Sequence, residues 1–146
     1  MRIIAIASLL LATMTIYCNA GPIKEEYELQ ERCGKRVEEL FKVKYGIDVY
    51  KNNVYKTNVG ETAISSYVNH YSRKHNKCFA IFSDTIMHID VGRSRSKIIY
   101  DVNENKRYGE FMIFDKENKP SYCSVLDTKC STESEWDKLV QPYMEQ

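Results

Sequence analysis

The stretch KCFAIFSDTIMHI, residues 77–89, is apolar and contains several β-branched and aromatic residues. Such a composition predicts a long β-strand. Side chains alternate between the two faces of a strand. One face of this strand therefore carries Cys78, Ala80 and Phe82, and the other carries Phe79 and Ile81. A polar break at 74–76 and a turn at 92–96 indicate that the chain reverses on both sides of the strand.

Four further strands are predicted around this one. Residues 64–71 show a period of two, which is typical of a strand. The others are expected at 97–102, 107–114 and 122–126, separated by polar turns at 103–106 and 116–120. Such short connections favour an antiparallel sheet. Residues 46–63 are rich in Asn and predict a loop with at most one short strand.

Two amphipathic helices are predicted on either side of the strands. The first spans residues 23–45 and ends at Gly46, a favoured position for a glycine after a helix. Its apolar stripe consists of Leu29, Cys33, Val37, Leu40 and Phe41. The second begins with a capping box from Thr132 to Glu135, and Pro142 is expected to end or kink it. Its apolar positions are Trp136, Leu139, Val140 and Tyr143.

The order of helix, about five strands and helix predicts an α+β domain. Each helix has a single apolar stripe, and we expect both to pack on one face of the antiparallel sheet.

The first twenty residues have the pattern of a signal peptide. Arg2 precedes an apolar run over 3–16, and small residues at the end of the segment indicate cleavage before Gly21. The run is too short to span a bilayer, which takes about 20 residues. Cys18 would permit a lipoprotein site, but the bulky Ile-Tyr pair before it disfavours lipid attachment. The mature chain, 21–146, is expected to be one domain that is exported to the periplasm or secreted.

Charge excludes one large class of partner. The full chain has 21 Lys and Arg against 20 Asp and Glu, and cleavage removes only Arg2, which leaves 20 of each. Nucleic-acid binding requires a surplus of cations, so the balance argues against it. Adsorption to anionic membranes is equally unsupported.

Four cysteines remain after cleavage: Cys33, Cys78, Cys123 and Cys130. An even number in an oxidising compartment predicts disulfides, with three possible connectivities. The predicted elements favour the pairs Cys33–Cys78 and Cys123–Cys130. No two of the four have the close spacing of structural zinc ligands, and we predict neither a metal nor a cofactor.

Several segments resemble a family of small exported bacterial proteins of uncharacterised function. They are Asn69–Tyr71, Asn76–Phe79, Tyr100–Glu104, Tyr108–Phe111, Cys123–Leu126 and Glu135–Glu145. The resemblance covers nearly the whole mature chain from Cys33. It implies a periplasmic or secreted setting and supports the framework of four cysteines, but it implies no activity, cofactor or catalytic residue.

Motifs for catalysis are weak, and no catalytic residue is assigned. The chain has no nucleophile elbow and no metal-protease motif. His70 could contribute to a polar pocket, and a small periplasmic hydrolase acting on envelope polymer or peptide is the alternative hypothesis. Such an enzyme would need a deep polar pocket with His70 or an acidic pair.

Recognition of another molecule is the leading hypothesis. Arg93 and Arg95 could bind an anion. A tyrosine-rich segment over 45–71 offers Tyr67 and Tyr71 as contact residues, because tyrosine combines broad contact area with a polar tip. The sequence thus favours a non-enzymatic binding module of the cell envelope, monomeric or weakly dimeric, whose partner is an envelope protein or peptide.

Overall fold

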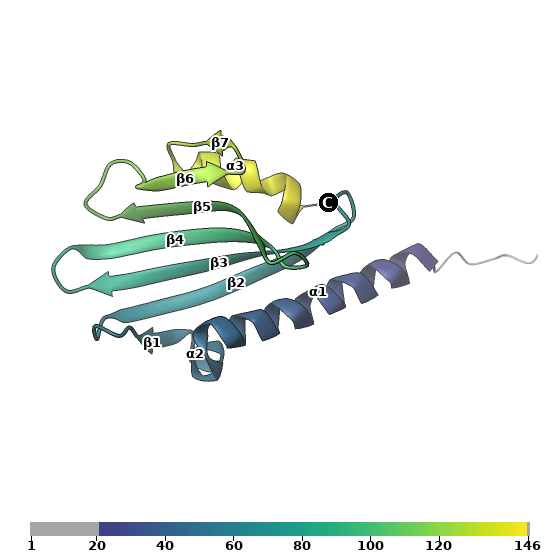
Figure 1. The fold of residues 1–146 in the computed structure, drawn as a ribbon, viewed down its shortest axis with the longest axis horizontal. Coiled ribbons are helices and arrows are strands. Elements are labelled where there is room, and N and C mark those ends of the chain that lie inside the picture. The colour runs from purple at the N-terminus through teal and green to yellow at the C-terminus, as the bar shows by residue number, and fades with distance from the viewer. Residues whose placement is uncertain (1–20, 146) are drawn as a thin grey trace, which may run out of the picture.

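The structure, a computed structural model, describes residues 21–145; the predicted signal peptide over 1–20 lies outside the described residues. Seven strands form one antiparallel sheet in sequence order, with helices before and after it (Figure 1). The elements are α1 (Gly21–Tyr45), α2 (Ile47–Asn52), β1 (Val54–Lys56), β2 (Thr62–Ser72), β3 (Lys77–His88), β4 (Gly92–Asp101), β5 (Lys106–Phe114), β6 (Tyr122–Val125), β7 (Thr128–Lys129) and α3 (Glu133–Met144). The α+β class is confirmed.

The strand count differs from the expected five or so. β1 and β7 contain three and two residues, too few to leave a periodic pattern in the sequence. β4 begins at Gly92, where a turn was expected, because Arg and Ser alternate over 93–96 and continue the strand. Residues 47–52 form a short helix within the expected loop, and Val49 is buried on its inner side. Gly46, with φ of 92°, separates this helix from α1.

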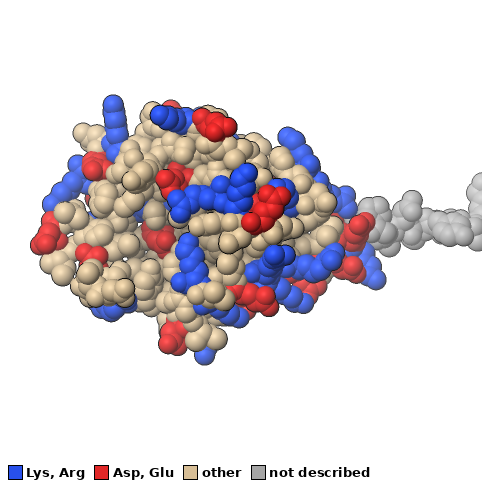
Figure 2. All heavy atoms as spheres, viewed as in Figure 1, with Lys and Arg blue, Asp and Glu red and all other residues tan. Residues whose placement is uncertain are grey.

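The two long helices lie on opposite faces of the sheet, so the expectation that they share one face is wrong. β3 carries apolar side chains on both faces, and each face needs its own cover. Cys78, Ala80 and Phe82 pack with α1, whereas Phe79 packs with α3. We call these faces the α1 side and the α3 side. Figure 2, drawn from the same direction as Figure 1, shows charged side chains of both signs over α1.

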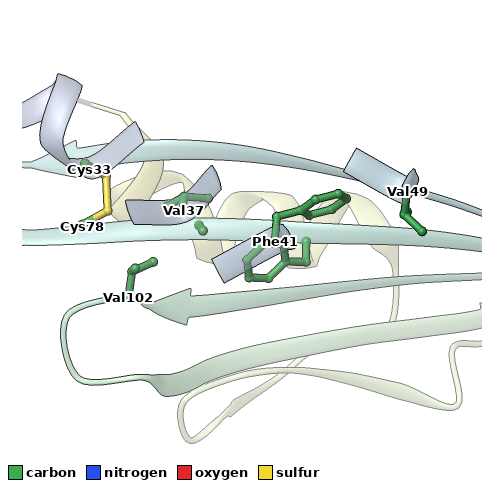
Figure 3. Close-up of a cluster of buried hydrophobic side chains, with 8 residues drawn as sticks. Cys33, Val37, Phe41, Val49, Cys78 and Val102 are labelled. Carbon is green, nitrogen blue, oxygen red and sulfur yellow. A yellow bond between two sulfur atoms is a disulfide. The ribbon is translucent and has the colours of Figure 1, made fainter. Parts of the chain in front are cut away.

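The α1 side contains the first core cluster (Figure 3). Val37 and Phe41 from α1 and Val49 from α2 lie over β3 and the start of the β4–β5 turn, where Val102 is buried. The second cluster, on the α3 side, places Trp136 and Val140 against buried side chains of four strands. These are Phe79, Ile99, Phe111 and Val125.

The predicted disulfide pairs are the ones that the structure contains. Cys33–Cys78 joins α1 to β3 across a separation of 45 residues, and Cys123–Cys130 closes the short β6–β7 region. Loop-closure entropy assigns them about 4 and about 2.5 kcal/mol of stabilisation, respectively. The second bridge lies directly before α3, whose N-cap Thr132 accepts the Glu135 amide at 3.2 Å as predicted. Pro142 lies inside the last turn of this helix, which ends at Met144.

Candidate functional site

Part of the sheet on the α3 side is left open by both helices. The open sheet patch, as we name it, consists of Val54, Ile64, Val68 and Met87, whose exposed fractions are 42–57%. The strand register brings them together on β1, β2 and β3: Val54 pairs with Ile64, and Met87 lies opposite Thr62. The other residues on this face, between and beside them, are Lys56, Thr62, Ser66, Ile81, Ser83 and Thr85, of which Lys56 is charged and donates to Thr62 Oγ1 at 2.7 Å. The patch is therefore a mainly uncharged surface with one lysine, Lys56, on its β1 edge.

Two turns extend the apolar surface at the same end of the sheet. Successive strands are antiparallel, so the β1–β2 and β3–β4 turns lie together at the left edge of Figure 1. They expose Val59, Ile89 and Val91. A single apolar side chain on a protein surface is common, whereas a contiguous group of them is typical of an interaction site.

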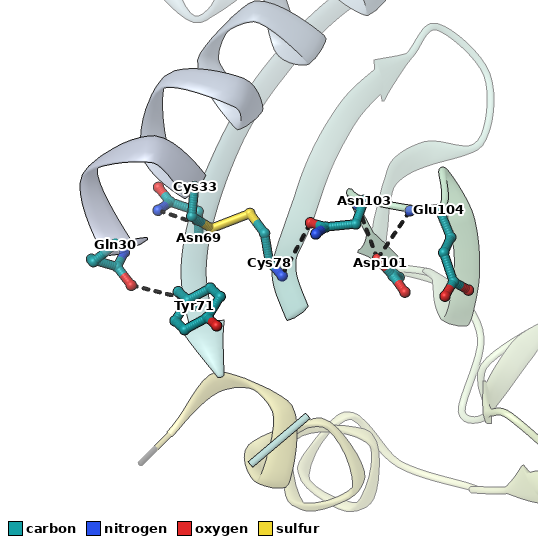
Figure 4. The surroundings of a disulfide bond; sticks show 8 residues. All are labelled: Gln30, Cys33, Asn69, Tyr71, Cys78, Asp101, Asn103 and Glu104. Atoms are coloured by element: carbon teal, nitrogen blue, oxygen red, sulfur yellow. Dashed lines mark hydrogen bonds between the residues drawn. A yellow bond between two sulfur atoms is a disulfide. The ribbon is translucent and has the colours of Figure 1, made fainter. Parts of the chain in front are cut away.

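Tyr67 and Tyr71 lie on the other side of the sheet, beneath α1. Both are half-buried, and the Tyr67 ring lies 4.8 Å from that of Phe41. The Tyr71 amide donates to Gln30 Oε1 at 2.7 Å (Figure 4). Tyr45, Tyr50, Tyr55, Tyr67 and Tyr71 all pack against the first core cluster. The tyrosine-rich segment thus forms the rim of the core, and the binding role of these residues stays a prediction.

Arg93 and Arg95 project on the α3 side of β4 and are paired with carboxylates. Arg93 Nε lies 3.1 Å from Asp115, and Arg95 Nη1 lies 2.7 Å from Glu133 at the start of α3. Lys97 contacts the same glutamate at 2.8 Å. Burial acts to raise the pKa of Glu133, but its bonds to Lys97 and Arg95 lower that pKa on balance. Arg95 and Lys97 therefore link α3 to the sheet, and an anion bound by Arg93 or Arg95 would have to displace Asp115 or Glu133.

His70 is half-buried on β2 and faces the α3 side, away from Tyr67 and Tyr71. Its Nε2 atom is buried without a hydrogen-bond partner. Burial lowers the pKa of His70, against a smaller opposing effect of Glu26. A general acid or base needs a positioned partner, and the structure provides none for this nitrogen.

One polar network could not be predicted from the sequence. His88 Nδ1 lies 3.0 Å from Glu61 Oε1, and His88 Nε2 lies 2.7 Å from Ser94 Oγ, an arrangement like that of serine hydrolases. Ser94, however, is only 3% exposed. β4 is paired with β3 and β5 at this residue, so its backbone amides are used in the sheet and cannot stabilise an oxyanion. The network links the β1–β2 turn to β3 and β4, and only the register of the β3–β4 hairpin could have revealed it.

No family model, curated protein or solved structure matches this chain. The resemblance to small exported bacterial proteins therefore stays a prediction. Among residues 21–145, no helix is long and apolar enough to cross a bilayer. The same residues contain no group of three or more His, Cys, Asp or Glu side chains arranged to hold a metal ion.

Proposed function

We propose that this protein is an exported, non-enzymatic binding module that contacts an envelope protein or peptide through the open sheet patch. The observation that carries the proposal is the exposure of four large apolar side chains on adjacent strands, Val54, Ile64, Val68 and Met87. Leaving such side chains in water costs free energy, which a partner's surface would recover. Two disulfides are compatible with the oxidising compartment that export implies.

The dimensions of the patch limit the affinity it can supply. Three strands spaced about 4.8 Å apart, followed for about seven residues, present roughly 300 Å². If all of that area were apolar, burying it would contribute at most about 7 kcal/mol, within the roughly 4–15 kcal/mol that association costs. The patch alone therefore supports weak binding. Contacts from Val59 and Ile89 in the adjoining turns would extend it.

The chemistry of the patch also defines the partner. A charged group buried against Val68 would lose its hydration without gaining an ion pair, because Lys56 lies opposite Thr62, six residues away along β2. The matching surface is therefore apolar and uncharged, as on the face of a helix or sheet of another protein.

The experiment that tests this function places a charge within the patch. Val68→Lys should reduce capture of the partner from envelope extract at least about tenfold, because the ammonium group would be desolvated at the contact. Val43→Lys is the matched control, since Val43 is 85% exposed on α1. Equal capture by both variants at unchanged thermal stability would contradict the proposal.

A further inference from the structure

A small hollow lies beside the Cys33–Cys78 disulfide, on the α1 side and away from the open sheet patch. Its volume is about 200 Å³, and Arg32 and Arg36 of α1 line it together with Asn103 from the β4–β5 turn. Leu29 and the disulfide give it an apolar floor. No acidic side chain lines this hollow.

The two arginines differ from the other arginines of residues 21–145. Arg73, Arg93, Arg95 and Arg107 each form an ion pair with a carboxylate. Arg32 and Arg36 form none within the described residues, although acids are frequent along α1. Three of the six acids of α1 pair instead with lysines of the same helix, and Glu26 pairs with Arg73: the lysine pairs are Glu28 with Lys24, Glu31 with Lys35 and Glu38 with Lys42.

Their spacing brings two positive charges together. Residues four apart on a helix are neighbours, so Arg32 and Arg36 lie one above the other at the hollow. Like charges at this spacing destabilise a helix slightly. An anion placed between the two guanidinium groups would remove that repulsion and accept hydrogen bonds from both.

Asn103 adds a further donor, held in a fixed position. Its Oδ1 accepts the Cys78 amide at 3.3 Å, so the amide NH₂ group is the part that remains for a ligand (Figure 4). Asp101 Oδ1 accepts the Asn103 amide at 2.9 Å and fixes the turn. The carboxylate of the nearby Glu104 pairs with Lys77, with Oε1 lying 2.8 Å from Nζ, and forms no ion pair with Arg32 or Arg36.

We propose that this hollow is a binding site for a carboxylate or phosphate group, held by Arg32, Arg36 and the Asn103 amide. Guanidinium groups recognise both oxyanions through paired hydrogen bonds. The hollow is smaller than the roughly 300–1,000 Å³ typical of drug-sized ligands, so it accommodates one anionic group with a short apolar part against Leu29. The C-terminal residue of a peptide and a small organic phosphate share this chemistry.

Titration followed by NMR tests the site, with inorganic phosphate and N-acetylglycine as the two probes. At least one probe should saturate and shift the Asn103 side-chain amide, and Arg32→Gln/Arg36→Gln should weaken its binding at least about tenfold. A response to N-acetylglycine alone assigns a carboxylate ligand, and a response to phosphate alone assigns a phosphate ligand.

Lys35→Gln is the control, because it removes one charge from the same helix outside the hollow. It should bind as the wild type does. The proposal is overturned if neither probe saturates, or if the double variant binds as tightly as the control. The open sheet patch is untouched by these changes, so either result leaves the proposed function to its own test.

Discussion

Lys77 Nζ lies 2.6 Å from Asp101 Oδ2, and the side chain of Asp101 is completely buried. This pair joins the first residue of β3 to the last residue of β4. The second oxygen of Asp101 accepts the backbone amides of Asn103 and Glu104 and so shapes the following turn. Lys77 directly precedes Cys78 in β3, so a covalent and an ionic link strengthen the same end of the sheet, on its two faces.

Asp101→Asn should destabilise the fold by about 2–4 kcal/mol, because it replaces the buried carboxylate that accepts from Lys77. Urea denaturation monitored by circular dichroism measures the loss. Glu104→Gln, which changes the exposed partner of the same lysine, should cost less than about 1 kcal/mol. Equal losses for the two variants would show that the buried pair contributes no more to the free energy of unfolding than the exposed pair does.

Replacement of Gly109 or Gly34 by alanine should change the stability of the fold in opposite directions. At Gly109, an added Cβ would lie 2.5 Å from the Ser124 carbonyl oxygen and 2.8 Å from Val125 Cα, so β5 and β6 would have to separate. Gly109→Ala should therefore destabilise the protein by roughly 2 kcal/mol or more.

At Gly34, within α1, the nearest atom to an added Cβ is Asn69 Nδ2 at 3.6 Å, an ordinary contact. Gly34→Ala should stabilise the protein by up to about 1 kcal/mol, because alanine has the higher helix propensity. Melting temperatures of the Gly109→Ala and Gly34→Ala variants test both predictions. A rise for Gly109→Ala, or a clear fall for Gly34→Ala, would contradict the packing described.

Stability should fall as the pH decreases from 7 towards 5, in part because of His70. Its pKa is lowered in the folded state from the ordinary 6.5, so the unfolded chain takes up the proton first and is favoured as the pH falls through this range. His70→Gln should reduce the slope of stability against pH. Chemical denaturation at pH 7, 6 and 5 measures that slope. An unchanged slope would mean that other groups cause the whole dependence.

Much of the fold could be predicted from local pattern. Alternation in residues 77–89 correctly divided the side chains of β3 between two faces, and the stripe on α1 placed Cys33 where it meets Cys78. The face that each helix covers could not be predicted, because an apolar stripe shows that a helix is packed and not on which side of a sheet. The start of β4 was missed because Arg93 and Arg95 resemble turn residues until their partners Asp115 and Glu133 are in place.

The candidate sites were harder to predict, because they depend on which side chains lack a partner. Alternation along a strand cannot reveal exposure: Ile64 and Val68 have the spacing of core residues and become a surface only because α3 does not reach them. Arg32 and Arg36 look like any charged face of a helix. They become distinctive only when the neighbouring acids are seen to pair with lysines.

Site-specific photo-crosslinking tests the central claim most directly. A photoreactive amino acid at position 68, in the open sheet patch, should form an adduct with one envelope protein or peptide, whereas the same group at position 43 should form none. An adduct with a second copy of this chain alone would contradict a distinct partner. The absence of any adduct from position 68, or the same adduct from both positions, would contradict the proposed surface.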